Sequence, residues 1–82
     1  MAHDRVVITE QEFRRHERER LRAFADEVAE ALEDFQTSAR AVALDCNLDP
    51  RLVRRALHGI RINGECEHRI RYWIERQRRL KR

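Results

Sequence analysis

Apolar side chains recur every three or four residues in the first part of the chain, which is the spacing of one face of an α-helix. This stripe consists of Leu21, Phe24, Val28, Leu32 and Phe35. Thr9 and Glu12 have the spacing of a capping box, so a helix is predicted over about 9–35. Residues 13–20 are almost all Glu, Arg and His, so we expect the N-terminal half of this helix to face solvent or a partner.

A second helix is predicted over about 38–46, where small and apolar residues again share one face. Its inner face carries Ala39, Val42, Ala43 and Cys46. Thr37 or Ser38 can cap its start through a hydroxyl oxygen. Asn47 tolerates the left-handed conformation, so we expect it to end this helix in a tight turn.

A third helix is predicted over about 50–58. Asp49 supplies a capping carboxylate and Pro50 occupies the first helical position, which together are a strong start signal. Gly59 is expected to end the helix.

A fourth helix is predicted over about 64–79, with Asn63 or Gly64 as its cap. Its apolar stripe consists of Cys66, Ile70, Trp73, Gln77 and Leu80. The two ends of the chain are interpreted as a short arm or strand at residues 1–8, which contains the β-branched Val6-Val7-Ile8, and a basic tail at 80–82.

The composition agrees with a single all-α domain over 1–82, built as a compact four-helix unit. Two Gly and one Pro in 82 residues leave few tight turns, which argues against a β-sandwich or a barrel. A chain of this length buries only about 60% of the surface that its unfolded form exposes, so its core is small. A large catalytic cleft is therefore not expected.

Charge is distributed unevenly along the chain. Residues 1–36 hold 6 Arg and 10 Asp or Glu, a net −4, whereas residues 37–82 hold 12 Lys or Arg and 5 Asp or Glu, a net +7. The basic half favours a polyanionic partner, most often nucleic acid. Of the 18 basic residues 17 are Arg, whose planar guanidinium suits phosphates and guanine edges.

The second and third predicted helices are joined by a short turn and form a helix-turn-helix pattern. This stretch resembles the DNA-binding domains of the lambda-repressor, Cro and lac-repressor group. The resemblance is carried by Ala43, Asn47, Val53, His58 and Gly59. Asn47 replaces the Gly common at the turn, and Ala56 is smaller than the aliphatic residue usual at its position.

The resemblance implies that the outer face of helix 50–58 enters the major groove of DNA. The residues that it places at base edges are Arg51, Arg54 and Arg55. An arginine that binds guanine O6 and N7 contributes about 1–3 kcal/mol of discrimination. The residues placed to contact phosphates are Ser38, Arg40, His58 and Arg61. The alternative is that the arginines form ion pairs with Asp45, Asp49 or carboxylates of the first helix.

Other chemistries lack the residues they need. Cys46, His58, Cys66 and His68 share no CxxC or HxxxH spacing, so no metal site is predicted. The chain has no phosphate-binding glycine loop and no nucleophile elbow, and neither an enzyme nor a cofactor is expected. It also lacks a signal-peptide layout and a run of about 20 apolar residues, so we expect a cytoplasmic protein with free thiols and no membrane contact.

Together these patterns predict a sequence-specific regulator of transcription that binds double-stranded DNA. We expect a homodimeric repressor, of the kind found in phages or plasmids, that acts by occupying an operator, because one short helix contacts too few bases. The dimer surface is left open between the first helix, the fourth helix and the Val6-Val7-Ile8 segment. The alternative is a protein-interaction adaptor or an antitoxin that binds its partner through the first helix or the stripe of the fourth.

Overall fold

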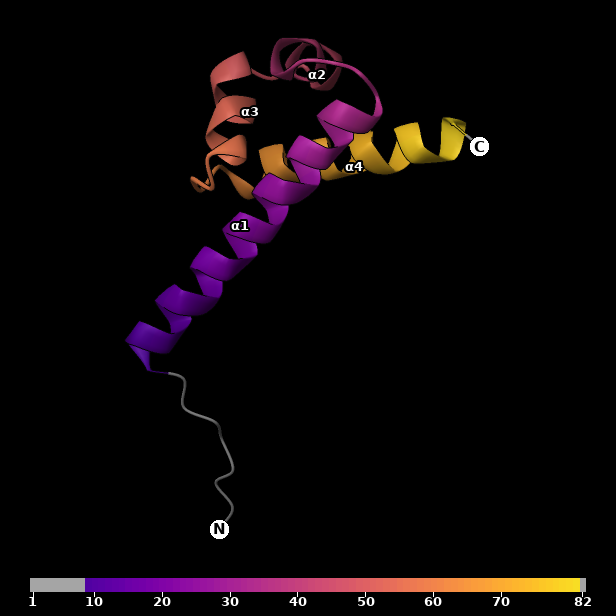
Figure 1. Cartoon of the computed structure of the whole chain (residues 1–82). Coiled ribbons are helices and arrows are strands. Elements are labelled where there is room, and N and C mark those ends of the chain that lie inside the picture. The colour runs from indigo at the N-terminus through magenta and orange to yellow at the C-terminus, as the bar shows by residue number, and fades with distance from the viewer. Residues whose placement is uncertain (1–8, 82) are drawn as a thin grey trace.

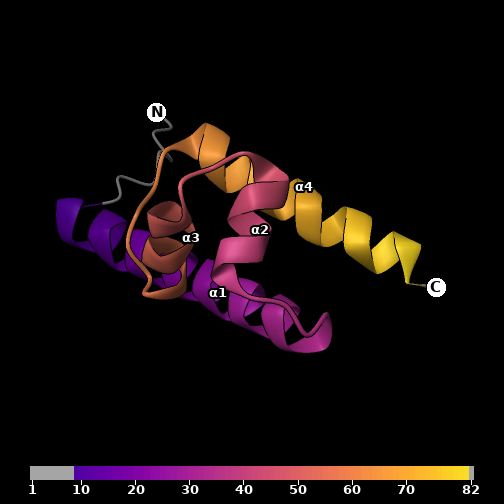
Figure 2. The same cartoon turned by 90° about the horizontal axis from the view of Figure 1, so that it is seen from above.

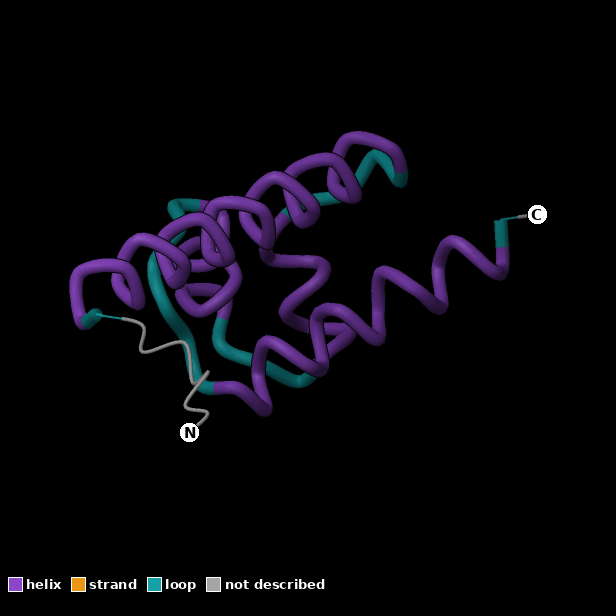
Figure 3. The backbone as a smooth tube through the Cα atoms, turned by 90° about the horizontal axis from the view of Figure 1, so that it is seen from below, coloured by secondary structure: helices purple, strands orange, loops and turns teal. Residues whose placement is uncertain are grey.

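The computed structural model describes residues 9–81, which form four α-helices joined by short loops, with no strand among them (Figure 1, Figure 3). The helices are α1 (Glu10–Asp34), α2 (Ala39–Cys46), α3 (Pro50–Leu57) and α4 (Gly64–Leu80). The predicted all-α, four-helix fold is confirmed, and each predicted boundary lies within one residue of the observed one. The arm or strand predicted at residues 1–8 and the last residue, Arg82, lie outside the described residues.

Each helix begins after a residue whose side chain accepts a hydrogen bond from an amide of the first turn. The capping residues are Thr9, Ser38, Asp49 and Asn63, with donor–acceptor distances of 3.1, 3.1, 2.9 and 2.7 Å. Ser38 rather than Thr37 therefore caps α2, and Asn63 rather than Gly64 caps α4. A cap of this kind typically stabilises a helix by about 1 kcal/mol, because it pairs an amide that the helix itself leaves open.

The two long helices, α1 and α4, cross each other, and α2 and α3 lie together over one side of that pair (Figure 1, Figure 2). The largest fully buried side chains come from all four helices and are Phe24, Val28, Val42, Val53 and Ile70. The stripe predicted on α4 packs into this core, where Ile70, Trp73 and Ile74 are buried. Leu80, which is 68% exposed, is the one large apolar side chain of that stripe at the surface. The stripe therefore offers little apolar surface to a protein partner.

The N-terminal half of α1 projects beyond the rest of the molecule (Figure 1). All side chains of residues 10–20 except Glu17 are exposed, and Phe13 is 63% exposed. Burial begins at Leu21 and continues through Phe24 and Val28. The structure thus confirms that only the C-terminal half of this helix packs.

Arginines and glutamates connect α1 to α4 beside the core. The Nη1 of Arg20 donates to Glu67 at 2.8 Å, and the Nη1 of Arg71 donates to Glu27 at 2.8 Å. The guanidinium of Arg71 also lies 4.5 Å from the centre of the Phe24 ring, within the range of a cation–π contact. Burial raises the pKa of Glu67, but hydrogen bonds from Arg20 and Arg71 outweigh it and hold that pKa below its usual value.

The C-terminal end of α4 contacts α1 and does not extend freely into solvent. The ammonium of Lys81 donates to the carbonyl oxygen of Asp34 at 2.7 Å, and the guanidinium of Arg78 lies 3.4 Å from the Asp34 carboxylate. Both cations also lie over the ring of Phe35. The prediction of a basic tail at 80–82 is therefore corrected at its first two residues, because Leu80 belongs to α4 and Lys81 binds the C-terminal end of α1.

We expect acid to weaken the link between α1 and α4. Because the pKa of Glu67 is lowered in the folded state, its contribution to stability is present above its unfolded pKa and is lost as the pH falls through the folded pKa. Glu67→Gln should lower the free energy of unfolding at pH 7 and flatten its decline between about pH 5 and pH 2. Urea unfolding at several pH values measures this. Glu75→Gln, on an exposed pair with Arg79, is the control and should change little. Parallel pH profiles for wild type and Glu67→Gln would contradict the assignment.

Candidate nucleic-acid interface

The turn between α2 and α3 is three residues long and is set by Asn47. Its backbone angles, φ 58° and ψ 48°, are left-handed, as the sequence predicted. The amide of Leu48 then donates to the carbonyl oxygen of Ala43 at 2.8 Å, which closes the end of α2. This turn redirects the chain sharply, so that α3 runs across α2 (Figure 2).

Small side chains allow α2 and α3 to approach each other and the long helices. Ala43 on α2 has no exposed surface, and Val53 and Ala56 on α3 are exposed by at most 1%. Leu52 and Leu57 lie partly buried at the edges of the same face. One side of α3 thus packs into the core, and the side chains on its opposite side face solvent.

The outward side of α3 carries the residues that the sequence placed at base edges. Arg51, Arg54, Arg55 and His58 are all exposed. At about 100° per residue, these four positions fall within an arc of about 100° around the helix axis, so they share one face. The structure therefore brings four of the seven predicted site residues onto one surface.

Ion pairing accounts for some of these arginines and not for others. Arg51 Nε lies 3.4 Å from the Asp49 carboxylate, and the Arg51 side chain is 82% exposed. The hydrogen bond from the Arg51 amide, together with this guanidinium, holds the pKa of Asp49 below its usual value. Arg54 and Arg55 form no ion pair within 4 Å of any carboxylate in the range 9–81, although the charge of Arg54 helps to lower the pKa of Asp49. The ion-pair alternative thus applies to Arg51 and leaves Arg54 and Arg55 without a direct partner among these residues.

Arg61 follows α3 and borders a shallow hollow beside it. The hollow lies between the Leu52 and Arg55 side of α3 and the loop that leads into α4. Arg61 is 78% exposed and its Nε lies 3.9 Å from Glu17, a distance typical of a weak surface contact. Its guanidinium is therefore available to an external anion.

Ser38 and Arg40 stand at the start of α2, apart from the cluster on α3. The Ser38 hydroxyl accepts from the amide of Ala41, which leaves its own proton to be donated elsewhere. Arg40 is exposed and has no ion pair among residues 9–81. No hydrogen bond or ion pair within that range joins either residue to α3.

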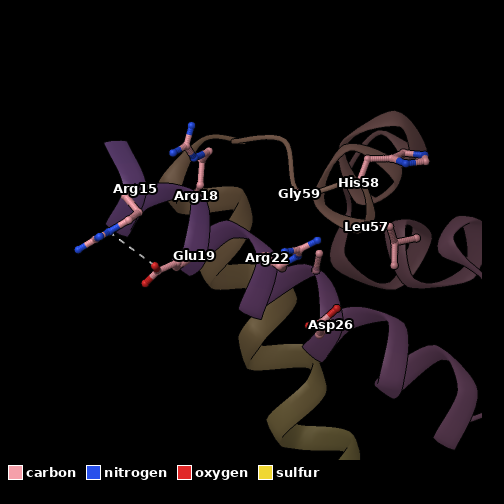
Figure 4. A pocket seen from close by; sticks show the side chains of 9 residues that line it. Arg15, Arg18, Glu19, Arg22, Asp26, Leu57, His58 and Gly59 are labelled. Atoms are coloured by element: carbon pink, nitrogen blue, oxygen red, sulfur yellow. Dashed lines mark ion pairs between the residues drawn. The ribbon is translucent and has the colours of Figure 1, made fainter. Parts of the chain in front are cut away.

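Three arginines of α1 lie next to the C-terminal end of α3 and extend the candidate interface, although the sequence indicated only that they belong to an acidic helix. Arg15, Arg18 and Arg22 of α1 line a hollow of about 540 Å³ next to Leu57, His58 and Gly59 (Figure 4). Their spacing of three and four residues can be read from the sequence. Because residues 1–36 have a net negative charge, however, the sequence did not indicate them as candidates for binding nucleic acid. Nothing in the sequence alone indicated that α3 ends beside them.

Across 9–81, no three His, Cys, Asp or Glu side chains are grouped as metal ligands. Cys46 and Cys66 are free thiols, and burial, with the nearby Asp45, raises the pKa of Cys46, which makes it a poor nucleophile. None of the four helices is long and apolar enough to cross a membrane.

Comparison of the chain with protein-family models, with curated proteins and with solved structures found no match.

The left-handed turn at Asn47 should tolerate Gly and resist other residues. We expect Asn47→Ala to lower the free energy of unfolding by about 1–2 kcal/mol, because a Cβ without a polar partner is strained at positive φ. Asn47→Gly serves as the matched control, since it keeps the conformation accessible. Thermal unfolding followed by circular dichroism measures both. Equal destabilisation of the two variants would contradict a conformational role of this residue.

Proposed function

We propose that this chain is a sequence-specific DNA-binding regulator of the helix-turn-helix type, with α3 in the major groove. The observation that carries the proposal is the division of α3 into two faces. Val53 and Ala56 are buried in the core, while Arg54 and Arg55 extend outward with no ion-pair partner among the described residues. Exposed arginines that form no ion pair contribute little to folding, and they remain available to an external anion.

The chemistry of these side chains fits base edges and phosphates. The fork of an arginine donates two parallel hydrogen bonds to guanine O6 and N7, and only guanine presents that pair of acceptors in the major groove. We assign Arg51, Arg54 and Arg55 to base edges. Phosphate contacts, which position the protein without reading sequence, are assigned to Ser38, Arg40, His58 and Arg61.

The proposed regulator acts as a dimeric repressor that occupies its operator. At 1.5 Å per residue, the eight residues of α3 span about 12 Å and reach only a few base pairs. Two copies related by a two-fold axis would read half-sites about 34 Å apart, which gives the specificity that a single helix lacks. Repression then follows because the bound dimer excludes polymerase from the promoter.

A protein-interaction adaptor or an antitoxin is the second candidate, and the observation that favours it is Phe13. This side chain is 63% exposed and precedes the buried Leu21 by eight residues, so it continues the core stripe onto the projecting half of α1. An adaptor that uses this surface alone should have no measurable affinity for duplex DNA at low salt.

Selection of bound sequences from random duplex DNA is the test. We expect enrichment of two half-sites about one turn apart. On the selected duplex, Arg54→Ala/Arg55→Ala should weaken binding by about fivefold or more per arginine, because each removes a guanine contact worth about 1–3 kcal/mol. Fluorescence anisotropy measures the dissociation constants.

The matched control is Arg76→Ala/Arg79→Ala on α4, which removes the same charge from exposed positions far along the chain. Its effect should be several-fold smaller. Selection without enrichment, or equal affinity for the α3 double variant and wild type, would refute the proposed function.

A further inference from the structure

The projecting half of α1 carries a stripe of three arginines that the proposed function has not used. Arg15, Arg18 and Arg22 follow one another by three and four residues and therefore share one side of the helix. They line the hollow that α1 forms with the C-terminal end of α3. Figure 4 shows Arg22 pointing across this hollow toward Leu57 and Arg18 pointing outward beside it.

The unpaired charge of this stripe lies at its second and third members, Arg18 and Arg22. Arg15 Nε lies 3.9 Å from Glu19, so part of its charge is balanced within the helix. Neither Arg18 nor Arg22 forms an ion pair within residues 9–81, although Asp26 also lines the hollow. Arg20, on another side of α1, is instead bound by both Glu17 and Glu67. The ion-paired Arg20 and the unpaired Arg18 and Arg22 therefore lie on different sides of α1.

The hollow beside α1 has a counterpart on the other flank of α3. The first hollow contacts α3 at Leu57 and His58, and the second contacts it at Leu52 and Arg55. Five residues separate Leu52 from Leu57, so their side chains leave the helix about 140° apart. Arg61 borders the second hollow as Arg18 and Arg22 border the first. The outward face of α3 thus has arginines of other segments on both sides.

This arrangement matches the charge pattern of duplex DNA around its major groove. A helix that enters the groove has one phosphate strand on each side, and the groove is about 12 Å wide. The charged residues that line the α1 hollow are the three arginines against the carboxylates Glu19 and Asp26, so its lining is net basic. An acidic backbone is therefore the occupant that the charges favour.

We propose that Arg18 and Arg22, supported by Arg15, bind the phosphate backbone on one side of the groove that α3 enters. The projecting half of α1 is then a second DNA-contacting element that extends the footprint beyond the bases touched by α3. This inference rests on the proposed function, because it takes the duplex to be seated on α3.

The test compares Arg18→Gln/Arg22→Gln with wild type on two duplexes of equal length, one with the selected sequence and one with its half-sites scrambled. Anisotropy titrations over a series of salt concentrations give the affinities and their salt dependence. The variant should bind both duplexes more weakly by a similar factor and keep the wild-type preference between them. Its plot of log K against log salt should be shallower by about 0.9 for each phosphate that it no longer neutralises, which is about 1.8 for each subunit and about 3.6 for the proposed dimer.

Two controls separate this inference from the proposed function. Arg76→Gln/Arg79→Gln removes the same charge from α4 and should leave the slope closer to that of wild type. Circular dichroism should show unchanged helicity for all variants, since these side chains are exposed.

Each other outcome is decisive. An α1 variant with the affinity and slope of wild type, alongside an impaired Arg54→Ala/Arg55→Ala variant, refutes the α1 contact and leaves the proposed function intact. A variant without the wild-type preference between the duplexes contacts bases, which refutes the phosphate assignment. Wild-type protein without duplex affinity refutes both proposals, and binding that depends on Arg18 and Arg22 but not on Arg54 and Arg55 refutes the role of α3.

Discussion

The burial of one face of α3 is the constraint on which the rest of this molecule depends. Val53 and Ala56 have almost no exposed surface, and Ala43 of α2 has none, so the apolar face of α3 is fully covered by the other helices. Such burial does not tolerate a helix that rotates about its axis, because rotation would replace apolar side chains in the core with charged ones. The orientation of α3 is therefore fixed, and the outward direction of its arginines is fixed with it.

The core of the described residues is small, with 13 buried side chains, so contacts outside it also hold the helices together. The links between α1 and α4 include the pairs Arg20–Glu67 and Arg71–Glu27 and the contacts of Arg78 and Lys81 with Asp34. The Trp73 indole donates to Asp45 at 3.2 Å, which links α4 to α2. These groups use part of the large charge of the chain to hold its long helices together. The arginines that remain without partners among the described residues are found mainly around α3, which is the physical basis for assigning them to an external anion.

Most of the fold was predictable because its signals are local. Capping side chains and apolar stripes depend on neighbours within four residues, so the bounds of all four helices and the left-handed turn at Asn47 followed from the sequence. The links across 44 or 47 residues did not, because they depend on how α1 crosses α4. Ile62 was also missed: it is only 7% exposed but lies in a loop, where no periodicity marks it as part of the core. The candidate site was likewise predictable only in part. Helical spacing predicted that the arginines of α3 share one face. The position of Arg18 and Arg22 near the end of α3 depends on tertiary packing and could not be predicted.

In our proposal, the outer face of α3 is the surface that meets DNA. Amide chemical shifts of isotopically labelled protein, recorded by NMR as the selected duplex is added, test this most directly. We expect the largest changes within residues 51–58, smaller changes near residues 18–22 and at Arg61, and none on the exposed side of α4. Shifts confined to α4, or none along α3 at saturating duplex, would contradict it.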